Sequence, residues 1–251
     1  MERFVVSSKL LSTYIYGLFI LLMFGALFTG GPFAFVNWIV GRDPRWGMQV
    51  VVRFFWRLFL KMSPVLGHIT IKHPESLNRI SPAIYVSSHQ SSIDFVLLGS
   101  IIKNFVSISN HPISDLPIFL KLPRLVGVYY MEKLNPNAAI TVFNKLTKRL
   151  QEGVNVFIFP EGTRNYSDTL QSFQKGAFRL SADNNVPIIP VIINGTGRIV
   201  SKGSNVAKTS QATDIEVAFL DPIYPQKGET VRSLMKRTKE VMQVEVTRNF
   251  S

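Results

Sequence analysis

The sequence lacks cysteine altogether and is poor in charged residues. The absence of cysteine excludes a cysteine nucleophile, a disulfide framework and a cysteine-based zinc site. Charged residues make up 18% of the 251 residues, whereas ordinary soluble domains carry about 25%. Apolar residues reach 46%. Together the two values predict that part of the protein contacts lipid.

Acidic residues are also scarce relative to basic ones. Lys and Arg total 28 against 16 Asp and Glu, which gives a formal net charge of +12. Such an excess favours nucleic acid, anionic lipid headgroups or a phosphorylated substrate as partner. The apolar excess favours lipid. Because the basic residues are spread through the chain without an aromatic-basic platform, a membrane-anchored nucleic-acid binder is the weaker alternative, and we expect no nucleic-acid partner.

One long stretch, from Leu10 to Gly41, contains no charged residue. Its first part, Leu10 to Thr29, is about as long as a helix that crosses a bilayer. The triplet Gly30-Gly31-Pro32 follows and predicts a turn or helix break. A cleaved signal peptide is the alternative. Against it, the run is longer than the usual apolar region of such a signal, and no small-x-small cleavage site stands out.

A second helix is predicted from Trp46 to Met62. Arg53, Arg57 and Lys61 recur every four residues there and form a basic stripe. The helix either lies at the membrane interface, with its basic groups reaching lipid phosphates, or packs against the rest of the protein. Basic residues flank both ends of the apolar run, so we expect a hairpin whose two ends stay on the cytoplasmic side of the inner membrane. Residues 1–64 are assigned to this anchor.

Residues 65–251 are predicted to form an α/β domain, a mostly parallel sheet flanked by helices. Short apolar runs alternate there with amphipathic stretches, which is typical of this architecture. Strands are expected at 83–87, 104–109, 125–131, 154–159, 186–193 and 215–220. Helices are expected at 137–153, 173–183 and 230–248.

His89 and Asp94 follow the first of these expected strands. The carboxyl ends of strands are where α/β sheets place their functional sites. Five residues of helix rotate by roughly 140°, so the two side chains meet only if His89 lies in the loop and Asp94 in the first helical turn. Ser91 or Ser92 would be the N-cap. Asp94 would then accept the Nδ1 proton and leave Nε2 as a base. Taken alone, this spacing fits a capping or surface pair better.

A second polar cluster follows the expected strand at 154–159. It contains Glu161, Gly162, Thr163 and Arg164. Gly162 allows a close approach of the backbone, Thr163 adds a hydroxyl donor, and the planar guanidinium of Arg164 suits a phosphate. An ordinary strand-to-helix turn with a solvated arginine is the alternative. Further on, Lys175 adds a cation near a predicted helix start, where anions are favoured.

Taken together, these blocks resemble the glycerolipid acyltransferase family, in particular the bacterial 1-acylglycerol-3-phosphate acyltransferases. The resemblance rests on His89-x4-Asp94 and on the later run Phe159-Pro160-Glu161-Gly162-Thr163-Arg164. Two further segments, 173–176 and the proline-bearing 186–191, fit the pattern of the family. The second motif departs from it, because Glu132-Lys133 stands where an Asp-Arg pair is more common. That segment is thought to help bind the acceptor.

The resemblance implies transfer of an acyl group from acyl-CoA or acyl-ACP to the sn-2 hydroxyl of lysophosphatidic acid. It implies that His89 is the general base, that Asp94 orients it, and that Arg164 holds the acceptor phosphate, with Lys121 and Lys133 as further candidates. Glu161 would orient Arg164 or nearby backbone. A thioester is already activated, so neither a cofactor nor a covalent intermediate is required. No set of metal ligands is evident in the sequence.

Two alternatives share this fold. One is an acyltransferase with another acceptor, such as a lysophosphatidylcholine-type lipid, a lyso-ornithine lipid or glycerol-3-phosphate. The other is a non-catalytic protein that binds or scaffolds lipid, although the intact pair of His89 and Asp94 argues against it. In each case membrane lipids are the expected partners.

Overall fold

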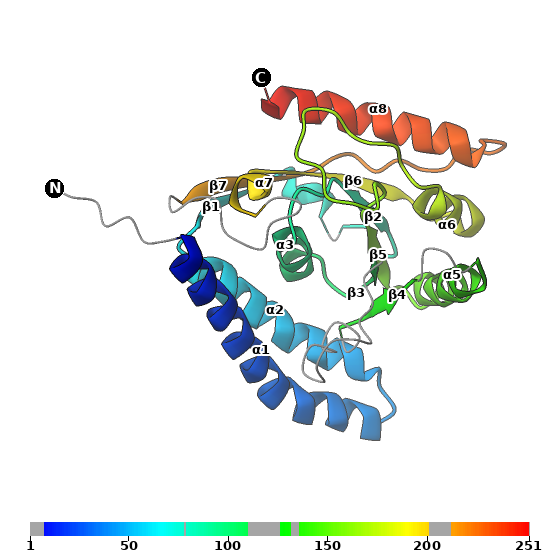
Figure 1. Ribbon diagram of the computed structural model, residues 1–251. Coiled ribbons are helices and arrows are strands. Elements are labelled where there is room, and N and C mark those ends of the chain that lie inside the picture. Colours follow the sequence, from blue (N-terminus) through cyan, green and yellow to red (C-terminus); the bar gives the residue numbers. More distant parts are fainter. Residues whose placement is uncertain (1–7, 78, 110–125, 132–135, 201–211, 251) are drawn as a thin grey trace.

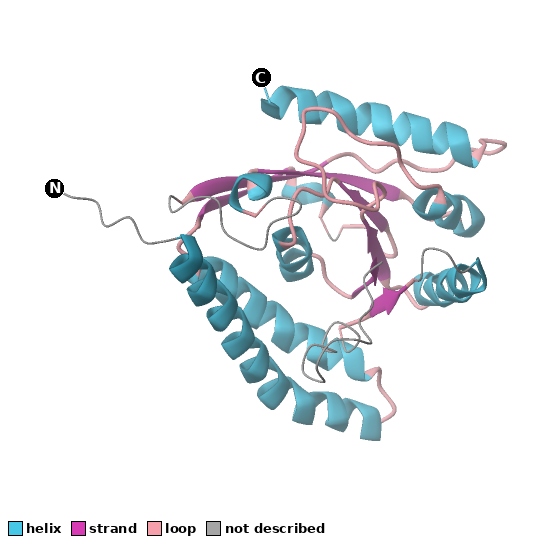
Figure 2. Ribbon diagram, viewed as in Figure 1, coloured by secondary structure: helices cyan, strands magenta, loops and turns pink. Residues whose placement is uncertain are grey.

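The computed structural model describes residues 8–77, 79–109, 126–131, 136–200 and 212–250. They form one sheet with helices on both of its faces (Figures 1 and 2). The strands are β1 (Leu66–Lys72), β2 (Ile84–Ser87), β3 (Phe105–Ser109), β4 (Val128–Tyr130), β5 (Asn155–Ile158), β6 (Ile188–Asn194) and β7 (Thr213–Phe219). The helices are α1 (Ser8–Ile39), α2 (Pro44–Met62), α3 (Ile93–Ile101), α5 (Pro136–Gln151), α6 (Gly176–Asn184), α7 (Thr196–Ile199) and α8 (Val231–Phe250), with a short 3₁₀ turn, η1 (Pro74–Ser76).

The strands are ordered β1-β7-β6-β2-β5-β3-β4. β2 pairs in parallel with both β5 and β6, and β3 pairs in parallel with β5 and β4. β7 is antiparallel to β6, and β1 is parallel to β7, so these two strands run against the other five. The predicted α/β class with a mostly parallel sheet is confirmed. The carboxyl ends of β2, β5 and β6 therefore meet at one edge of the sheet.

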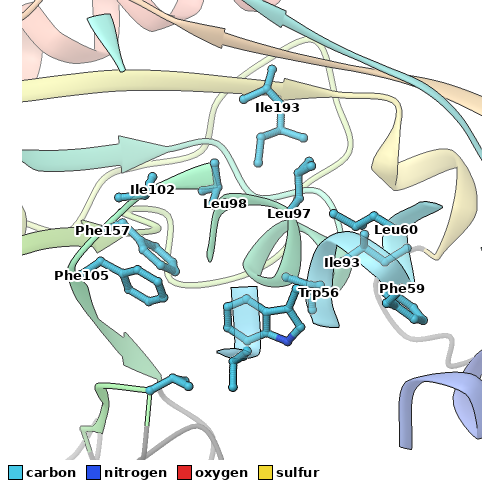
Figure 3. Packing of buried hydrophobic residues seen from close by; sticks show 14 of the residues in the cluster. Trp56, Phe59, Leu60, Ile93, Leu97, Leu98, Ile102, Phe105, Phe157 and Ile193 are labelled. Carbon is cyan, nitrogen blue, oxygen red and sulfur yellow. The ribbon is translucent and has the colours of Figure 1, made fainter. Parts of the chain in front are cut away.

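Alternate side chains of the strands point to two hydrophobic cores. Ile84 and Val86 of β2 belong to the core under α5, α6 and α8, whereas Tyr85 faces the core that contains α1, α2 and α3. Figure 1 shows α3 enclosed between the sheet and the pair α1 and α2. In Figure 3, Trp56 of α2 lies beside Leu97 of α3, and the rings of the sheet residues lie next to them.

α1 continues through Gly30-Gly31-Pro32, so the predicted helix break at this triplet is wrong. The chain turns at residues 40–43 instead, before α2 begins. Pro32 removes one backbone donor from the helix, but a single lost hydrogen bond does not end it here. A Cβ on Gly30 would lie 2.9 Å from the sulfur of Met48 in α2. The glycine thus permits close helix packing rather than a turn.

α1 and α2 lie side by side as a helix pair (Figure 1). Within the described chain, one helix, Lys9–Ile39, is long and apolar enough to cross a membrane, judged by length and composition alone. The second predicted helix is present as α2, with Asp43 as its N-cap. Most of the exposed large hydrophobic side chains among the described residues belong to this pair, for example Phe28 and Trp38.

Candidate active site

His89 and Asp94 lie together at the carboxyl end of β2. The Nδ1 atom of His89 is 2.9 Å from Oδ2 of Asp94. α3 begins at Ile93, so His89 lies in the loop and Asp94 in the first helical turn, which is the arrangement that the sequence predicts. Because Nδ1 faces the carboxylate, Nε2 is the nitrogen left for a substrate. The His89 side chain is 18% exposed and that of Asp94 is fully buried.

Further hydrogen bonds surround the Asp94 carboxylate. Its Oδ2 atom accepts the backbone N–H groups of Gln90 at 2.6 Å and Ser91 at 2.8 Å. Its Oδ1 atom accepts the hydroxyl of Thr196 at 2.6 Å. These donors replace the water that a buried charge has lost. Of the two serines predicted as N-cap, Ser92 occupies that position of α3 but makes no side-chain capping bond, whereas the Ser91 hydroxyl accepts the Ile93 N–H at 3.5 Å.

The imidazole of His89 stacks on the ring of Phe159. Their centroids are 4.0 Å apart and their planes differ by 18°. Phe159 directly follows β5, the strand that pairs with β2, so two adjacent strand ends deliver the two rings. The contact fixes the plane of the imidazole and places an apolar surface on one of its faces.

Glu161 ties the loop after β5 together. It is 6% exposed, and its Oε2 atom accepts the Asn165 side-chain amide and the Gln171 backbone N–H, each at 3.0 Å. Asn165 in turn donates its backbone N–H to the His89 carbonyl at 2.6 Å. Burial raises the pKa of Glu161, and the hydrogen bonds from Gln171 and Asn165 offset that effect only in part. Glu161 thus orients nearby backbone, and within the described residues it forms no ion pair with Arg164.

The other predicted binding residues lie in different parts of the structure, and two of them lie outside the described residues. Gly162 has a φ of +65°, a conformation that glycine adopts without strain. Thr163 and Arg164 are partly exposed on the same loop, and Arg164 forms no ion pair with any side chain in the described ranges. Lys175 is exposed at the N-cap position of α6. Lys121 and Lys133 lie outside the described residues.

An apolar cavity of about 180 Å³ adjoins this site. It lies between the helix pair and α3, and Ser92 and Ile93, which line it, directly precede Asp94. Its other lining residues come from α1, α2, the segment after α2, α3 and the end of α7: Ser12, Ile15, Tyr16, Phe19, Phe59, Val65, Val96, Ile199 and Val200. A cavity with these walls accepts a hydrocarbon chain far better than a polar group. No cluster of metal ligands occurs in the part of the chain that the structure describes.

Residues 68–194 match a protein family described as acyltransferase, and this segment is just over half of the chain. The chain belongs to the acyltransferase family. It is 38% identical over 151 residues to a chloroplast 1-acyl-sn-glycerol-3-phosphate acyltransferase of Arabidopsis thaliana, a match that covers 60% of this chain and 42% of the plant protein. It is 32% identical over 151 residues to the 1-acyl-sn-glycerol-3-phosphate acyltransferase of Haemophilus influenzae, covering 59% and 61% of the two chains.

This chain thus spans about two fifths of the length of the plant relative and three fifths of the length of the bacterial one. Its fold is similar to that of the 1-acyl-sn-glycerophosphate acyltransferase of Thermotoga maritima. The TM-score is 0.75 at 21% identity, and the match covers 96% of this chain and 95% of the other. At this identity the likeness establishes the fold alone.

Sequence reasoning did not assign a role to Thr196 or to the ring of Phe159 in this acyltransferase. Thr196 lies 102 positions from the aspartate it contacts, so no local spacing connects them. One signal was present for Phe159, because it ends an expected strand directly before the polar cluster. For Thr196 the only hint is its place just after the proline-bearing strand.

Proposed function

We propose that this acyltransferase moves a fatty acyl group from acyl-CoA or acyl-ACP to the sn-2 hydroxyl of lysophosphatidic acid, which yields phosphatidic acid. The observation that carries the proposal is the His89–Asp94 contact, with Nε2 left for an acceptor and an apolar cavity alongside. The relatives from Arabidopsis and Haemophilus, both named for 1-acyl-sn-glycerol-3-phosphate, support this acceptor.

In the proposed reaction His89 is a general base. Its Nε2 atom takes the proton of the acceptor hydroxyl as the oxygen attacks the thioester carbonyl, a contribution of about 10²–10⁴-fold. The carbon–sulfur bond then breaks, and the departing thiolate of the carrier takes the proton from the imidazolium. Asp94 holds the tautomer and stabilises the positive charge, as the aspartate does in a serine hydrolase triad. The acceptor hydroxyl takes the place of the serine, so no acyl-enzyme forms.

The remaining parts of the site would bind either the acyl tail or the phosphate headgroup of the lipids. The apolar cavity would hold an acyl tail, because its walls are almost entirely hydrocarbon. Arg164 would hold the acceptor phosphate, since this residue is partly exposed and its guanidinium forms no ion pair among the described residues. Lys121, Lys133 and Lys175 are further candidates for that anion. α1 and α2 would anchor the enzyme in the inner membrane, with the sheet on the cytoplasmic side.

A second acceptor class is favoured by one feature, the Glu132-Lys133 pair that departs from the pattern of the family. A lysophosphatidylcholine-type lipid and glycerol-3-phosphate both carry the phosphate that Arg164 would bind, whereas a lyso-ornithine lipid does not. These acceptors therefore differ in how their headgroups would bind, while the proton transfer to His89 is the same for each.

The test is an acyl-transfer assay on the purified full chain in detergent, with acyl-CoA and acyl-ACP as donors. The acceptors are lysophosphatidic acid, lysophosphatidylcholine, a lyso-ornithine lipid and glycerol-3-phosphate. We expect the highest kcat/KM with lysophosphatidic acid and a loss of at least about 10²-fold in His89→Ala. The matched control is His68→Ala, whose side chain is 97% exposed. A near-normal rate in His89→Ala, or transfer to the other acceptors alone, would refute the proposal.

The phosphate role of Arg164 is tested in the same assay. Arg164→Ala should raise the acceptor KM about tenfold or more and change kcat little, because binding is lost equally in the ground and transition states. Arg179→Ala removes a 76% exposed arginine from α6 and should leave both constants unchanged. An unaltered acceptor KM in Arg164→Ala would remove Arg164 from the phosphate site.

A further inference from the structure

Thr196 touches the site from the far side of Asp94. Its hydroxyl donates to Oδ1 of Asp94 at 2.6 Å, and both residues are completely buried. The other donors, His89 Nδ1 and the backbone N–H groups of Gln90 and Ser91, all meet Oδ2. In the described part of the chain, Thr196 is thus the donor to the second carboxylate oxygen.

The backbone before Thr196 is shaped to deliver this hydroxyl. Gly195 separates the end of β6 from α7 and has a φ of +100°, which side-chain-bearing residues rarely adopt. A Cβ there would lie 2.3 Å from the carbonyl oxygen of Asp214, so no other residue fits without backbone movement. Only a glycine therefore lets the chain leave β6 and place Thr196 against α3 directly.

Two more hydrogen bonds join the same two segments. The backbone N–H of Gly197 donates to the Gln90 side chain at 3.4 Å, and that of Ile193 donates to the Ser88 hydroxyl at 2.9 Å. The turn after β6 is thus fixed to the loop that carries His89 on both sides of Thr196. The position of the Thr196 hydroxyl is therefore fixed by contacts with the His89 loop.

We propose that Thr196 is a positioning residue for acyl transfer. This role rests on the function proposed above. A carboxylate can rotate about its Cβ–Cγ bond. With a donor on Oδ1, rotation would break the Thr196 bond as well as the bonds on Oδ2, so Oδ2 stays aimed at Nδ1 of His89. Without the hydroxyl, a buried charged oxygen loses its partner, and the histidine loses a fixed acceptor.

The first experiment compares Thr196→Val, which keeps the shape but removes the hydroxyl, with Thr196→Ser, which keeps the hydroxyl. Thr196→Val should lower kcat about 10- to 100-fold, the size expected for one hydrogen bond to a buried charge, with KM for both substrates within twofold. Thr196→Ser should recover most of the rate. The matched control is Thr238→Val, another fully buried threonine, whose hydroxyl has the Leu234 carbonyl of its own helix as its one partner among the described residues.

A double-mutant cycle shows whether Thr196 acts through Asp94. In an Asp94→Asn background, Thr196→Val should cost little further rate, because the carboxylate that it positions is already gone. Independent additive losses would overturn the proposal. So would a kcat in Thr196→Val within twofold of the natural protein, or a Thr196→Ser variant as slow as Thr196→Val.

A spectroscopic readout separates this proposal from the proposed function. In the full chain labelled with ¹⁵N-histidine, the hydrogen-bonded Nδ1 proton of His89 is identified by its loss in His89→Gln. That signal should shift or disappear in Thr196→Val and stay unchanged in Thr196→Ser and Thr238→Val. If the natural protein transferred no acyl group to any acceptor, the proposed function would fail, while the spectrum would still decide whether Thr196 positions the pair. An unchanged signal in Thr196→Val would overturn the proposal.

Discussion

Glu161 is the carboxyl group of the site whose burial is least compensated. Its Oε2 atom is hydrogen-bonded, but its Oε1 atom is buried without a partner among the described residues. Burial accordingly raises the pKa of Glu161 above its ordinary value, against the opposing effect of its hydrogen bonds. A carboxyl whose folded-state pKa is raised stabilises the fold below its unfolded pKa. That contribution is lost as the pH rises through the folded-state pKa.

Replacement of Glu161 by Gln should therefore help the fold more at high pH than at low pH. The amide oxygen of glutamine can still accept the Asn165 and Gln171 N–H groups, while the cost of a buried charge disappears. The Tm of Glu161→Gln relative to the natural protein should rise by a few degrees between pH 5 and pH 8. Asp183→Asn, at a 61% exposed side chain, is the control. A Tm difference independent of pH would contradict this account.

At the scale of residues, local patterns were predictable and distant contacts were not. His89 and Asp94 are five positions apart, so helix geometry alone predicts how they can meet. The hydrogen bonds from Thr196 to Asp94 and from Asn165 to the His89 carbonyl link segments that only the folded sheet brings together. The role of each of these residues in catalysis remains a prediction.

At the scale of elements, one buried side chain fastens α2 to the sheet. Gln49 is 5% exposed, and its Nε2 atom donates to the carbonyls of Phe105 at 2.6 Å and Val126 at 2.9 Å. Its Oε1 atom accepts the Phe105 N–H at 3.3 Å. A glutamine used fully in this way satisfies backbone groups at the start of β3 and just before β4, which would otherwise be buried without partners.

Gln49→Leu should consequently destabilise the protein, although leucine is apolar and the position is buried. Loss of the amide leaves three buried backbone groups unpaired at about 1–3 kcal/mol each, so Tm should fall by at least roughly 6 °C. The same change at the exposed Gln151 of α5 should shift Tm by little. Thermal unfolding in one detergent measures both variants, and equal shifts would show that Gln49 does not fasten the helix.

The order and type of most of the longer elements followed from sequence patterns, and two of the exceptions have a clear physical reason. The helix break at Gly30-Gly31-Pro32 was wrong because glycine also serves close packing, which depends on a neighbouring helix that the pattern does not show. β1 was not predicted at all. It is an edge strand paired on one side with β7, and Leu66 is the one buried residue in it, so it lacks the continuous apolar run of the inner strands. Both cases are decided by tertiary neighbours rather than by local preference.

At the scale of the whole molecule, apolar surface is concentrated on one side. The exposed large side chains of α1 include Leu21 at 67%, Phe24 at 49% and Phe28 at 85%, spaced so that they share a helix face. Basic side chains of α2 lie next along the chain, among them Arg53 and Lys61. A monomer in water rarely exposes so much continuous hydrocarbon, which supports the proposed membrane contact.

Replacement of Leu21, Phe24 and Phe28 by serine should weaken membrane binding at least about tenfold, because burial of such side chains in lipid contributes roughly 1.5–3 kcal/mol each. The measurement is flotation after cell-free synthesis of the full chain with phosphatidylcholine vesicles. The control replaces three other exposed apolar residues, Ile140, Val241 and Val244 of α5 and α8. Equal vesicle binding by the two triple variants would show that these α1 side chains contribute no more to membrane binding than other exposed apolar residues.

On the proposed function, an acyl tail in the apolar cavity would be part of the packing of the enzyme as well as its substrate. Residues of both α1 and α3 line the cavity, so a bound tail would contact both helices as a shared core residue does. A ligand that binds the folded protein and not the unfolded chain stabilises the folded protein by mass action. On the proposed function, we therefore expect the protein with a bound acyl tail to be more stable against unfolding than the empty protein.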